Sequence, residues 1–236
     1  LCLETATQVC SVALNDTRRT LCLREGEGVN VHSEKITTFI REVMEQAGIG
    51  YTQLDAVAVS KGPGSYTGLR IGVSTAKGVC YAAGLPLMAI DTLHAMAYGM
   101  RERLGAEVQR DDLFIPMIDA RRMEVYCAIF DAGMNRVKDT EAVVFGAEND
   151  SLFVFRYPFT ASNRIWLFGD GAPKLTPLFV NNPNIRVVED FKPSAAFMAP
   201  LAEQALKSGD FVDVAYFEPF YLKDFVAGKP HVKGLV

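Results

Sequence analysis

The sequence predicts an α/β fold built from two similar subdomains. Short apolar runs bounded by turn residues indicate strands, and stretches of helical periodicity alternate with them. The clearest unit covers residues 55–90, where a buried strand at 55–60, a Gly/Pro loop, a helix ending at Gly84 and a strand at 86–90 follow one another. Such a unit places two parallel strands side by side with a right-handed crossover between them.

The elements before and after this unit set the topology. Strand candidates at residues 1–4, 9–14 and 20–24 are separated by turns, which favours an antiparallel meander. Apolar residues recur every three or four positions over residues 36–47, which predicts a helix with Ser33 as N-cap and Gly48 after its last turn. A further helix is predicted over 93–104. The order β-β-β-α-β-α-β-α is that of the ribonuclease-H-like fold of actin, sugar kinases and Hsp70.

The second half of the chain begins in a similar way. Strands are predicted at 113–119, 123–131, near 141–145, at 165–168 and at 185–188, with helices over 173–180 and 194–207. Residues 147–163 carry no pattern that assigns them. We therefore predict an N-terminal subdomain over residues 1–104 and a degenerate copy of it over residues 105–236.

Composition restricts the class of protein. The 236 residues are 49% hydrophobic and 22% charged with a net charge of −4, which allows a sizeable core and disfavours nucleic-acid binding by the chain alone. The odd number of cysteines, five, and the absence of C-x-x-C spacing favour reduced thiols and a cytoplasmic location. No apolar run is as long as a membrane span, and no secretory signal pattern is present. We expect one or a few residues of the first strand to precede Leu1.

The helix of the strand–helix–strand unit has two distinct sides. Gly72 and Gly78 each cost about 1 kcal/mol relative to alanine inside a helix, so a close approach of another segment should explain them. A stripe of small residues, Gly72 and Ala76 among them, fits either packing inside the protein or a tight contact with a partner helix. The opposite ridge carries a tyrosine suited to an interface. The predicted partner interface comprises Arg70, Ser74, Lys77 and Tyr81 together with Gly72 and Ala76.

The loop before this helix carries three glycines, Gly62, Gly64 and Gly68. Their amides at a helix N-terminus could hold an anion such as a nucleotide phosphate. The spacing fits neither a Walker loop, because Leu69 and Arg70 follow Gly68, nor G-x-G-x-x-G. A simple turn is the alternative.

Several motifs point to one family. These are LETAT at 3–7 followed by CSVAL at 10–14, HSE at 32–34, KGPGSYTGLRIG at 61–72 and IDARRMEVY at 118–126. With them the chain resembles the TsaB (YeaZ) family, and GDG at 169–171 and PFYL at 219–222 still fit. The resemblance implies a role in making N6-threonylcarbamoyladenosine next to the anticodon of tRNAs that read codons starting with A.

The resemblance also implies partners. Proteins of this family are non-catalytic partners of TsaD, which transfers the threonylcarbamoyl group from an adenylate that TsaC makes. TsaE, a small ATPase, joins the pair. The expected partners are thus a TsaD-like protein, a TsaE-like ATPase and tRNA through the complex, and a second copy of the chain when it is alone. No cofactor is expected.

Single residues bear on catalysis. Catalytic relatives hold a metal partly through two histidines one helical turn apart; here His32 is present but Ile36 takes the second position and cannot be a ligand. Glu4 stands where the family pattern usually has Asp, and a backbone hydrogen bond explains it as well as a catalytic role. Asp170 fits an ordinary turn. We therefore expect a pseudo-enzyme.

Two other functions remain as alternatives. One is an ATP-dependent phosphotransferase or ATPase of the same superfamily, against which the lack of an acid pair for magnesium counts. The other, less supported, is a peptidase, for which neither H-E-x-x-H nor G-x-S-x-G occurs.

Overall fold

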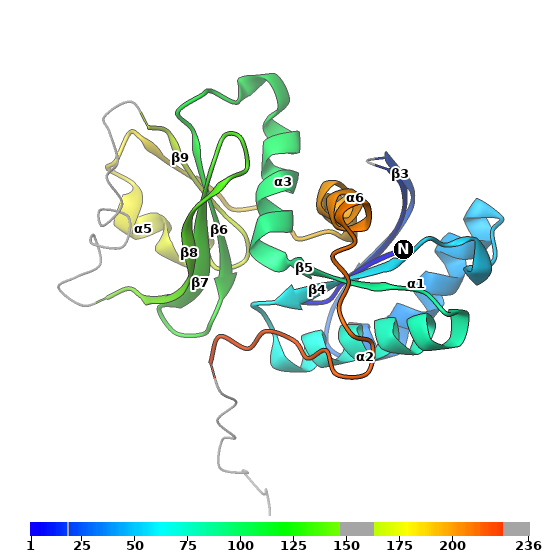
Figure 1. Cartoon of the computed structure of the whole chain (residues 1–236). Coiled ribbons are helices and arrows are strands. Elements are labelled where there is room, and N and C mark those ends of the chain that lie inside the picture. Colours follow the sequence, from blue (N-terminus) through cyan, green and yellow to red (C-terminus); the bar gives the residue numbers. More distant parts are fainter. Residues whose placement is uncertain (18, 147–162, 224–236) are drawn as a thin grey trace, which may run out of the picture.

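The computed structural model describes residues 1–17, 19–146 and 163–223. Two five-stranded sheets lie side by side, and helix α3 stands between them (Figure 1). The first sheet contains β1 (Cys2–Glu4), β2 (Val9–Asp16), β3 (Arg19–Glu27), β4 (Val57–Gly62) and β5 (Leu87–Asp91). The second contains β6 (Leu113–Asp119), β7 (Glu124–Asp131), β8 (Arg136–Val144), β9 (Ile165–Phe168) and β10 (Ile185–Val188).

The helices differ greatly in length. The α-helices are α1 (Val31–Ala47), α2 (Tyr66–Ala83), α3 (Thr92–Leu104), α5 (Thr176–Phe179) and α6 (Ala199–Ser208). Short 3₁₀ helices are η1 (Tyr51–Gln53), η2 (Gly105–Glu107), η3 (Pro173–Leu175) and η4 (Ala195–Met198). The predicted helices at 173–180 and 194–207 are thus each a 3₁₀ turn that continues into an α-helix.

Both sheets have the same topology. The strand orders are β3-β2-β1-β4-β5 and β8-β7-β6-β9-β10, so each strand of the first sheet corresponds to the strand numbered five higher in the second. In each sheet three strands form an antiparallel meander, and two further strands follow parallel to the first. The predicted ribonuclease-H-like fold and its degenerate second copy are confirmed.

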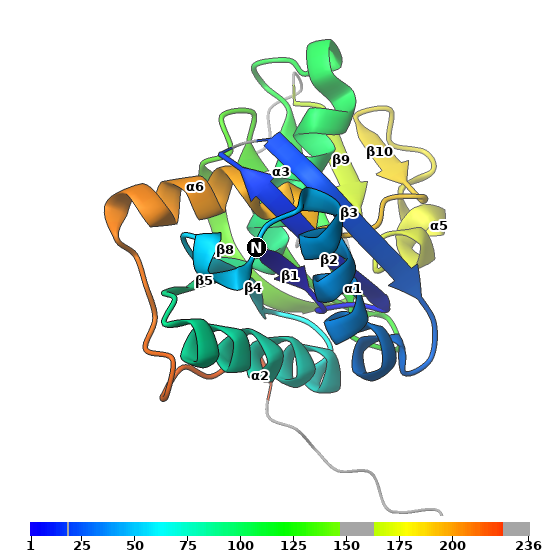
Figure 2. The same ribbon diagram turned by 90° about the vertical axis from the view of Figure 1, so that its right-hand side faces the viewer.

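The first sheet is covered on both faces. Alternate residues of a strand point to opposite faces, so Leu3 packs in the core under α1 and α2 while Cys2 packs under η4 and α6. Val59 and Ala58 divide in the same way on β4. Figure 2 shows α1 and α2 on one side of this sheet and α6 on the other. This burial on both faces explains why these strands read as continuous apolar runs.

The C-terminal part of the chain returns to the first sheet. After β10, η4 and α6 pack against β1, β2 and β5, and the amide of Ala195 donates to Ser11 Oγ at 2.8 Å. Residues 212–222, which we call the C-terminal strap, then run along α2 (Figures 1 and 2). The predicted boundary at residue 104 falls between the two sheets, but residues 195–222 of the predicted second subdomain lie against the first.

Two predicted details are wrong. Helix α1 begins at Val31, and its N-cap is Asn30 in a left-handed conformation (φ 62°) rather than Ser33, whose hydroxyl donates to the Asn30 carbonyl at 2.9 Å. Strand β8 begins at Arg136, five residues before the predicted strand, because its polar first half offers no apolar run. Of the stretch 147–163, which carries no pattern that assigns it, residues 147–162 lie outside the described residues.

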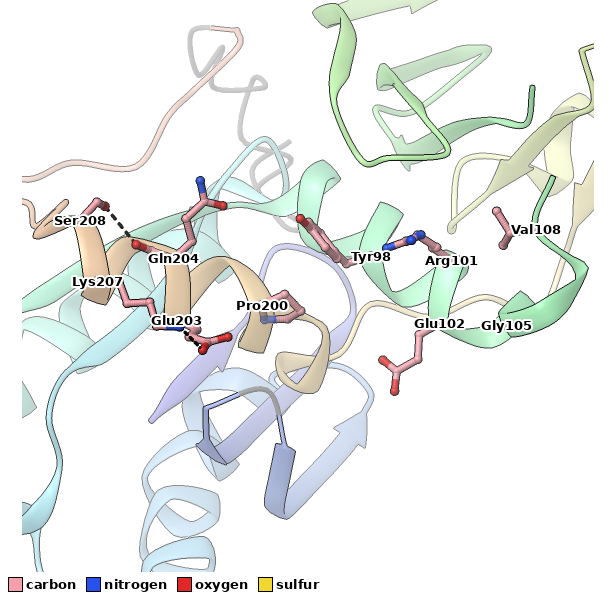
Figure 3. Close-up of a pocket in the computed structure, with 10 residues that line it drawn as sticks. All are labelled: Tyr98, Arg101, Glu102, Gly105, Val108, Pro200, Glu203, Gln204, Lys207 and Ser208. Atoms are coloured by element: carbon pink, nitrogen blue, oxygen red, sulfur yellow. Dashed lines mark hydrogen bonds and ion pairs between the residues drawn. The ribbon is translucent and has the colours of Figure 1, made fainter. Parts of the chain in front are cut away.

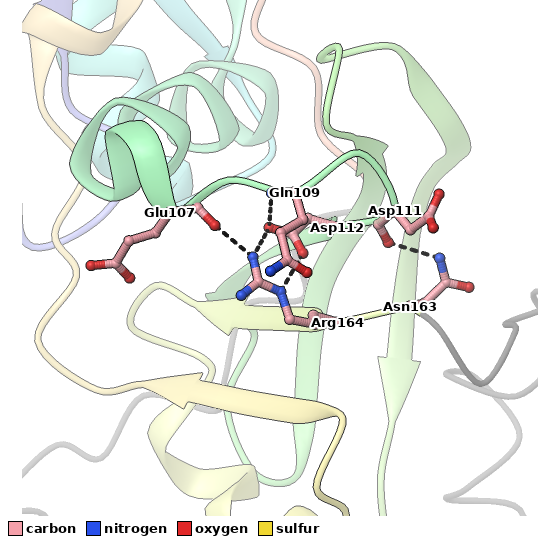
Figure 4. Close-up of polar contacts among 6 residues, drawn as sticks. All are labelled: Glu107, Gln109, Asp111, Asp112, Asn163 and Arg164. Atoms are coloured by element: carbon pink, nitrogen blue, oxygen red, sulfur yellow. Dashed lines mark hydrogen bonds and ion pairs between the residues drawn. The ribbon is translucent and has the colours of Figure 1, made fainter.

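A buried ion pair anchors the second sheet (Figure 4). The guanidinium of Arg164, just before β9, binds both carboxylate oxygens of Asp112 at 2.7 Å and the Glu107 carbonyl at 2.7 Å. The Asp112 side chain is completely buried and also accepts from the Gln109 amide at 2.9 Å. A buried carboxylate needs such partners, so this bidentate contact fixes the start of β9 beside β6.

Candidate functional site

Helix α2 carries most of the predicted interface residues, and its ends are well defined. The hydroxyl of Ser65 caps it by accepting from the Gly68 amide at 3.3 Å, and Gly84 ends it in a left-handed conformation (φ 67°). The buried face contains Gly68, Leu69, Gly72, Val73, Ala76 and Cys80. This face points into the core shared with β1 and β4.

Gly72 and Ala76 lie on that buried face. A Cβ atom added to Gly72 would lie 2.2 Å from Thr5 Oγ1, and Ala76 has no exposed surface. Of the two alternatives for the small stripe, packing inside the protein is therefore the one found at these two positions. Neither residue offers atoms to a partner in this conformation.

The rest of the predicted ridge faces outward. Arg70 and Ser74 are exposed, and 88% of the Tyr81 side chain is accessible. Lys77 is half-buried because its ammonium group donates to the Ala215 carbonyl of the C-terminal strap at 2.9 Å. The strap thus forms one border of the exposed face of α2. An aromatic ring so exposed on a rigid helix is typical of a contact residue.

A groove between α1 and α2 forms the other border. It has a volume of about 490 Å³, and its lining is Thr37, Ile40, Tyr51, Thr52, Ser74, Thr75, Gly78, Val79, Ala82 and Ala83. Most of these side chains are small, so a neighbouring helix could approach closely. A Cβ added to Gly78 would meet no atom within 4 Å. The cost of this glycine in the helix therefore has no explanation in internal packing.

The three glycines of the loop before α2 each face a carbonyl oxygen of the chain itself. A Cβ on Gly62 would lie 2.5 Å from the Phe220 oxygen, one on Gly64 2.4 Å from the Ala6 oxygen, and one on Gly68 2.1 Å from the Thr5 oxygen. Gly62 also has a φ of +113°, which favours glycine. Close backbone packing thus accounts for all three, and anion binding at this loop stays a prediction.

His32 and Ile36 lie in different surroundings. The imidazole Nε2 of His32 is 2.8 Å from the Thr7 carbonyl oxygen, which ties α1 to the turn after β1. Ile36, one turn later, is 98% buried in the core beside α2. Within the described residues, no group of three or more His, Cys, Asp or Glu side chains could hold a metal ion.

Glu4, at the end of β1, is buried. Its Oε1 accepts from the Ala6 amide at 2.6 Å, which is the backbone contact expected as one alternative. Burial raises the pKa of its carboxyl to about 7, although the hydrogen bonds from Ala6 and Ser60 work in the opposite direction. The nearby turn is also fixed by the hydroxyl of Ser60, which accepts from the Thr5 amide at 3.2 Å.

Asp170 belongs to a polar cluster that the sequence did not predict. Its Oδ1 accepts from the Asp119 amide at 3.0 Å, and burial and the Asp119 charge raise the pKa of its carboxyl. Lys174 binds the Asp119 carboxylate and donates to the Glu124 carbonyl at 2.6 Å. The parallel strands β6 and β9 end at one edge, which brings these residues together. The Lys174 ammonium group thus already pairs with the Asp119 carboxylate within the chain.

Two other hollows contain none of the predicted interface residues. The larger, about 1040 Å³, lies between α3 and α6, where Glu203 and Lys207 pair on its border (Figure 3). The other, about 410 Å³, lies where β4, β5, β8 and the strap meet, and an ion pair of Arg136 with Asp91 at 2.8 Å crosses it.

Comparisons with known proteins agree with the fold. The family model of TsaD, the tRNA N6-adenosine threonylcarbamoyltransferase, matches residues 24–227. The tRNA threonylcarbamoyladenosine biosynthesis protein TsaB of Escherichia coli K12 is 31% identical over 238 aligned residues, which cover 97% of this chain and 96% of the relative. The chain belongs to the TsaB family. YeaZ from Pseudomonas aeruginosa superposes with a TM-score of 0.74 at 25% identity, over 93% of this chain and 97% of that one.

The transferases themselves match over a shorter stretch. The tRNA N6-adenosine threonylcarbamoyltransferase of Geobacillus kaustophilus is 45% identical over 78 residues, 33% of this chain and 22% of that enzyme. The TsaB of Escherichia coli thus aligns with nearly the whole chain and this transferase with a third of it, while the TsaD family model covers residues 24–227. In the described part of the chain, no helix is both long and apolar enough to cross a membrane.

The sequence predicted part of this site and missed part of it. The outward orientation of Tyr81, Arg70 and Ser74 was predictable because a helical wheel separates the two sides of α2, and their contact with a partner stays a prediction. The C-terminal strap was missed, because its contacts with Lys77 and Lys61 join residues more than 130 positions apart. The PFYL motif at 219–222 was the available signal, since Phe220 donates its amide to the Lys61 carbonyl at 2.7 Å.

Proposed function

We propose that this chain is a non-catalytic partner of a TsaD-like transferase and is required for threonylcarbamoylation of the adenosine next to the tRNA anticodon. Membership of the TsaB family supports the pathway. The observation that carries the non-catalytic role is the pair formed by His32 and Ile36. At the position where catalytic relatives are expected to supply a second imidazole, this chain has a buried alkyl group that serves the core.

The environment of His32 supports the same conclusion. A metal-binding imidazole needs a free nitrogen facing an open position. Here Nε2 is engaged with the Thr7 carbonyl, while Nδ1, which has no hydrogen-bond partner among the described residues, is buried and has no open position beside it. The ring lies against Gly68 of α2, where an added Cβ would be 3.3 Å from it. His32 and Ile36, at the positions expected to supply the two metal ligands, thus join α1 to α2 and to the turn after β1.

The surface of α1 and α2 is the proposed contact with the transferase. It combines an exposed tyrosine, a groove lined by small residues and a helix glycine with no internal contact. These are features of an interface at which helices pack closely. A TsaE-like ATPase and tRNA would join through the complex, and the free chain would cover the same surface by forming a homodimer.

The first test is reconstitution. The chain, the TsaD-like and TsaE-like proteins of the same cell, the adenylate-forming enzyme and unmodified tRNA are combined, and the modified nucleoside is measured with each protein omitted in turn. We expect no product without this chain and none from this chain alone. Turnover by the chain alone, or full activity without it, would refute the proposal.

The second test is a set of surface variants. Tyr81→Glu places a charge in the proposed contact, and Gly78→Leu fills the groove where the free protein has space. Tyr81→Glu should keep the melting temperature of the wild type, and Gly78→Leu should melt at or slightly above it, because leucine has a higher helix propensity than glycine. Both should lose capture of the TsaD-like protein. Val180→Glu, at an exposed apolar position (72%) on the second subdomain, is the matched control and should bind normally. Normal capture by both α2 variants would exclude this surface.

A further inference from the structure

Next to Tyr81, α2 and the C-terminal strap enclose a small notch with two cationic side chains. Its volume is about 290 Å³, with Arg70 and Lys77 from the helix on one wall and Tyr221 of the strap on the other. Val73, which is 96% buried, forms part of its floor. The notch lies directly beside the surface that we propose as the contact with the transferase. The inference below rests on that proposed function.

The guanidinium of Arg70 is held in a fixed position. Its Nη1 donates to the Tyr66 hydroxyl at 2.6 Å, and the group lies 5.3 Å from the centre of the same ring. The Tyr66 ring in turn packs on Tyr221 of the strap, with centroids 4.8 Å apart. An arginine ordered in this way has less rotamer freedom to lose on binding, which favours recognition of a planar, charged group.

Neither cation has a carboxylate partner in the described part of the chain. Lys77 donates to a neutral carbonyl, that of Ala215, and Arg70 to a neutral hydroxyl. Glu218 also lines the notch, but it forms no ion pair with either of them among the described residues. Among the described residues, two cations without an ion pair and one carboxylate line the notch, which gives it a local positive charge on a chain whose net charge is −4. A positively charged notch is complementary to an acidic group of a binding partner.

We propose that this notch receives an acidic side chain of the TsaD-like partner. The carboxylate would accept hydrogen bonds from Arg70 and Lys77 while the partner's helix covers Tyr81 and the groove. The strap supplies the far wall, so the recognition site exists only when residues 217–221 lie on α2. Its position is fixed by the Phe220 amide, which bonds to the Lys61 carbonyl.

The test compares two double variants with equal loss of charge. Arg70→Gln with Lys77→Gln neutralises the notch, and Arg103→Gln with Lys207→Gln removes two exposed cations on α3 and α6. Affinity for the TsaD-like protein is measured by calorimetry in about 0.1 M and about 1 M salt, because screening grows over this range. We expect the notch variant to bind about tenfold more weakly at low salt and to lose most of the salt dependence, with the control unchanged. Thermal melting checks that both variants fold, and Arg70→Lys alone, which keeps the charge, should recover part of the loss.

A double-mutant cycle identifies the partner's group. Acidic residues on the docking face of the TsaD-like protein are changed to amides one at a time. One of these changes should weaken binding to the wild type about tenfold and leave binding to the notch variant unaffected. Additive losses for every partner acid would refute the assignment.

Other occupants give different results. If inorganic phosphate binds the free chain and binding requires Arg70, the notch is a site for small anions and the proposal is wrong. If the notch variant loses self-association in sedimentation experiments but keeps the transferase, the occupant is a second copy of the chain. If the notch variant and the control variant bind the TsaD-like protein with equal affinity, the role of the notch is refuted but the proposed function is not. If the wild-type chain does not bind the TsaD-like protein, the proposed function is refuted as well.

Discussion

The two glycines inside α2 allow the fold argument to be tested with a matched pair of substitutions, Gly72→Ala and Gly78→Ala. Both replace a helix-interior glycine by alanine and so share the same gain in helix propensity, about 1 kcal/mol. They differ only in what the new methyl group meets. At Gly78 it meets nothing within 4 Å, while at Gly72 it would lie 2.2 Å from Thr5 Oγ1.

The difference between the two variants is therefore the overpacking energy at Gly72. Thr5 is completely buried, and even if its hydroxyl rotated away, its Cβ would still lie 3.2 Å from the new methyl group, which is closer than ordinary van der Waals contact. Inserting a methyl group into such a site costs about 1–3 kcal/mol. For a chain of this size each kcal/mol moves the melting temperature by about 2–4 °C. We expect Gly78→Ala to melt about 2–4 °C above the wild type and Gly72→Ala about 2–12 °C below Gly78→Ala.

Differential scanning calorimetry of the two variants beside the wild type measures this difference. Equal melting temperatures would refute the close packing of α2 on β1, and a loss of stability in Gly78→Ala would show that this position is not open. Circular dichroism at 20 °C should be the same for all three proteins, which separates a change in stability from a change in fold.

Three further predictions concern single side chains. Folding raises the pKa of Glu4 to about 7, so its carboxylate destabilises the fold as pH rises from about 5 to 8. Glu4→Gln should therefore flatten the pH dependence of the melting temperature and, at pH 8, have a free energy of unfolding about 3 kcal/mol above that of the wild type. Identical pH profiles of the two proteins would contradict this. Arg164→Met leaves the buried Asp112 carboxylate without its ion pair and should lower the free energy of unfolding in urea by about 3–5 kcal/mol. Arg103→Met breaks an exposed ion pair and should lower it by less than about 1 kcal/mol. Similar losses in the two variants would contradict the anchoring role of the buried pair. Metal analysis of the purified chain should find no stoichiometric zinc or iron, and one tightly held ion per chain would overturn the interpretation of His32.

The strands and helices with strong local signals could be predicted from the sequence. Strand β9, four buried residues, and helix α2, with its glycine C-cap, were placed almost correctly because apolar runs and capping residues act locally. The N-cap of α1 was missed because Asn30 works through its left-handed backbone and makes no side-chain cap, while Ser33 only resembles a cap in sequence.

The site was harder to predict because its residues are distant in the sequence. Gly72 and Gly78 look equivalent in a helix, and only the position of Thr5 shows that one is internal and the other open. Similarly, Arg70 reads as an ordinary surface cation until Tyr221, about 150 residues later, is found to complete the notch beside it. A helical wheel contains no information about which distant segment covers each side.

The return of α6 to the first sheet affects the order in which the chain can fold during synthesis. Domains usually fold from the N-terminus as they emerge from the ribosome. Here the face of the first sheet that carries Ala13 and Met88 stays exposed until Ala202 has been made, whereas the described strands of the second sheet are complete at residue 188. Of the two sheets, the one that begins the chain is therefore the later to close, and α6 and the strap complete it.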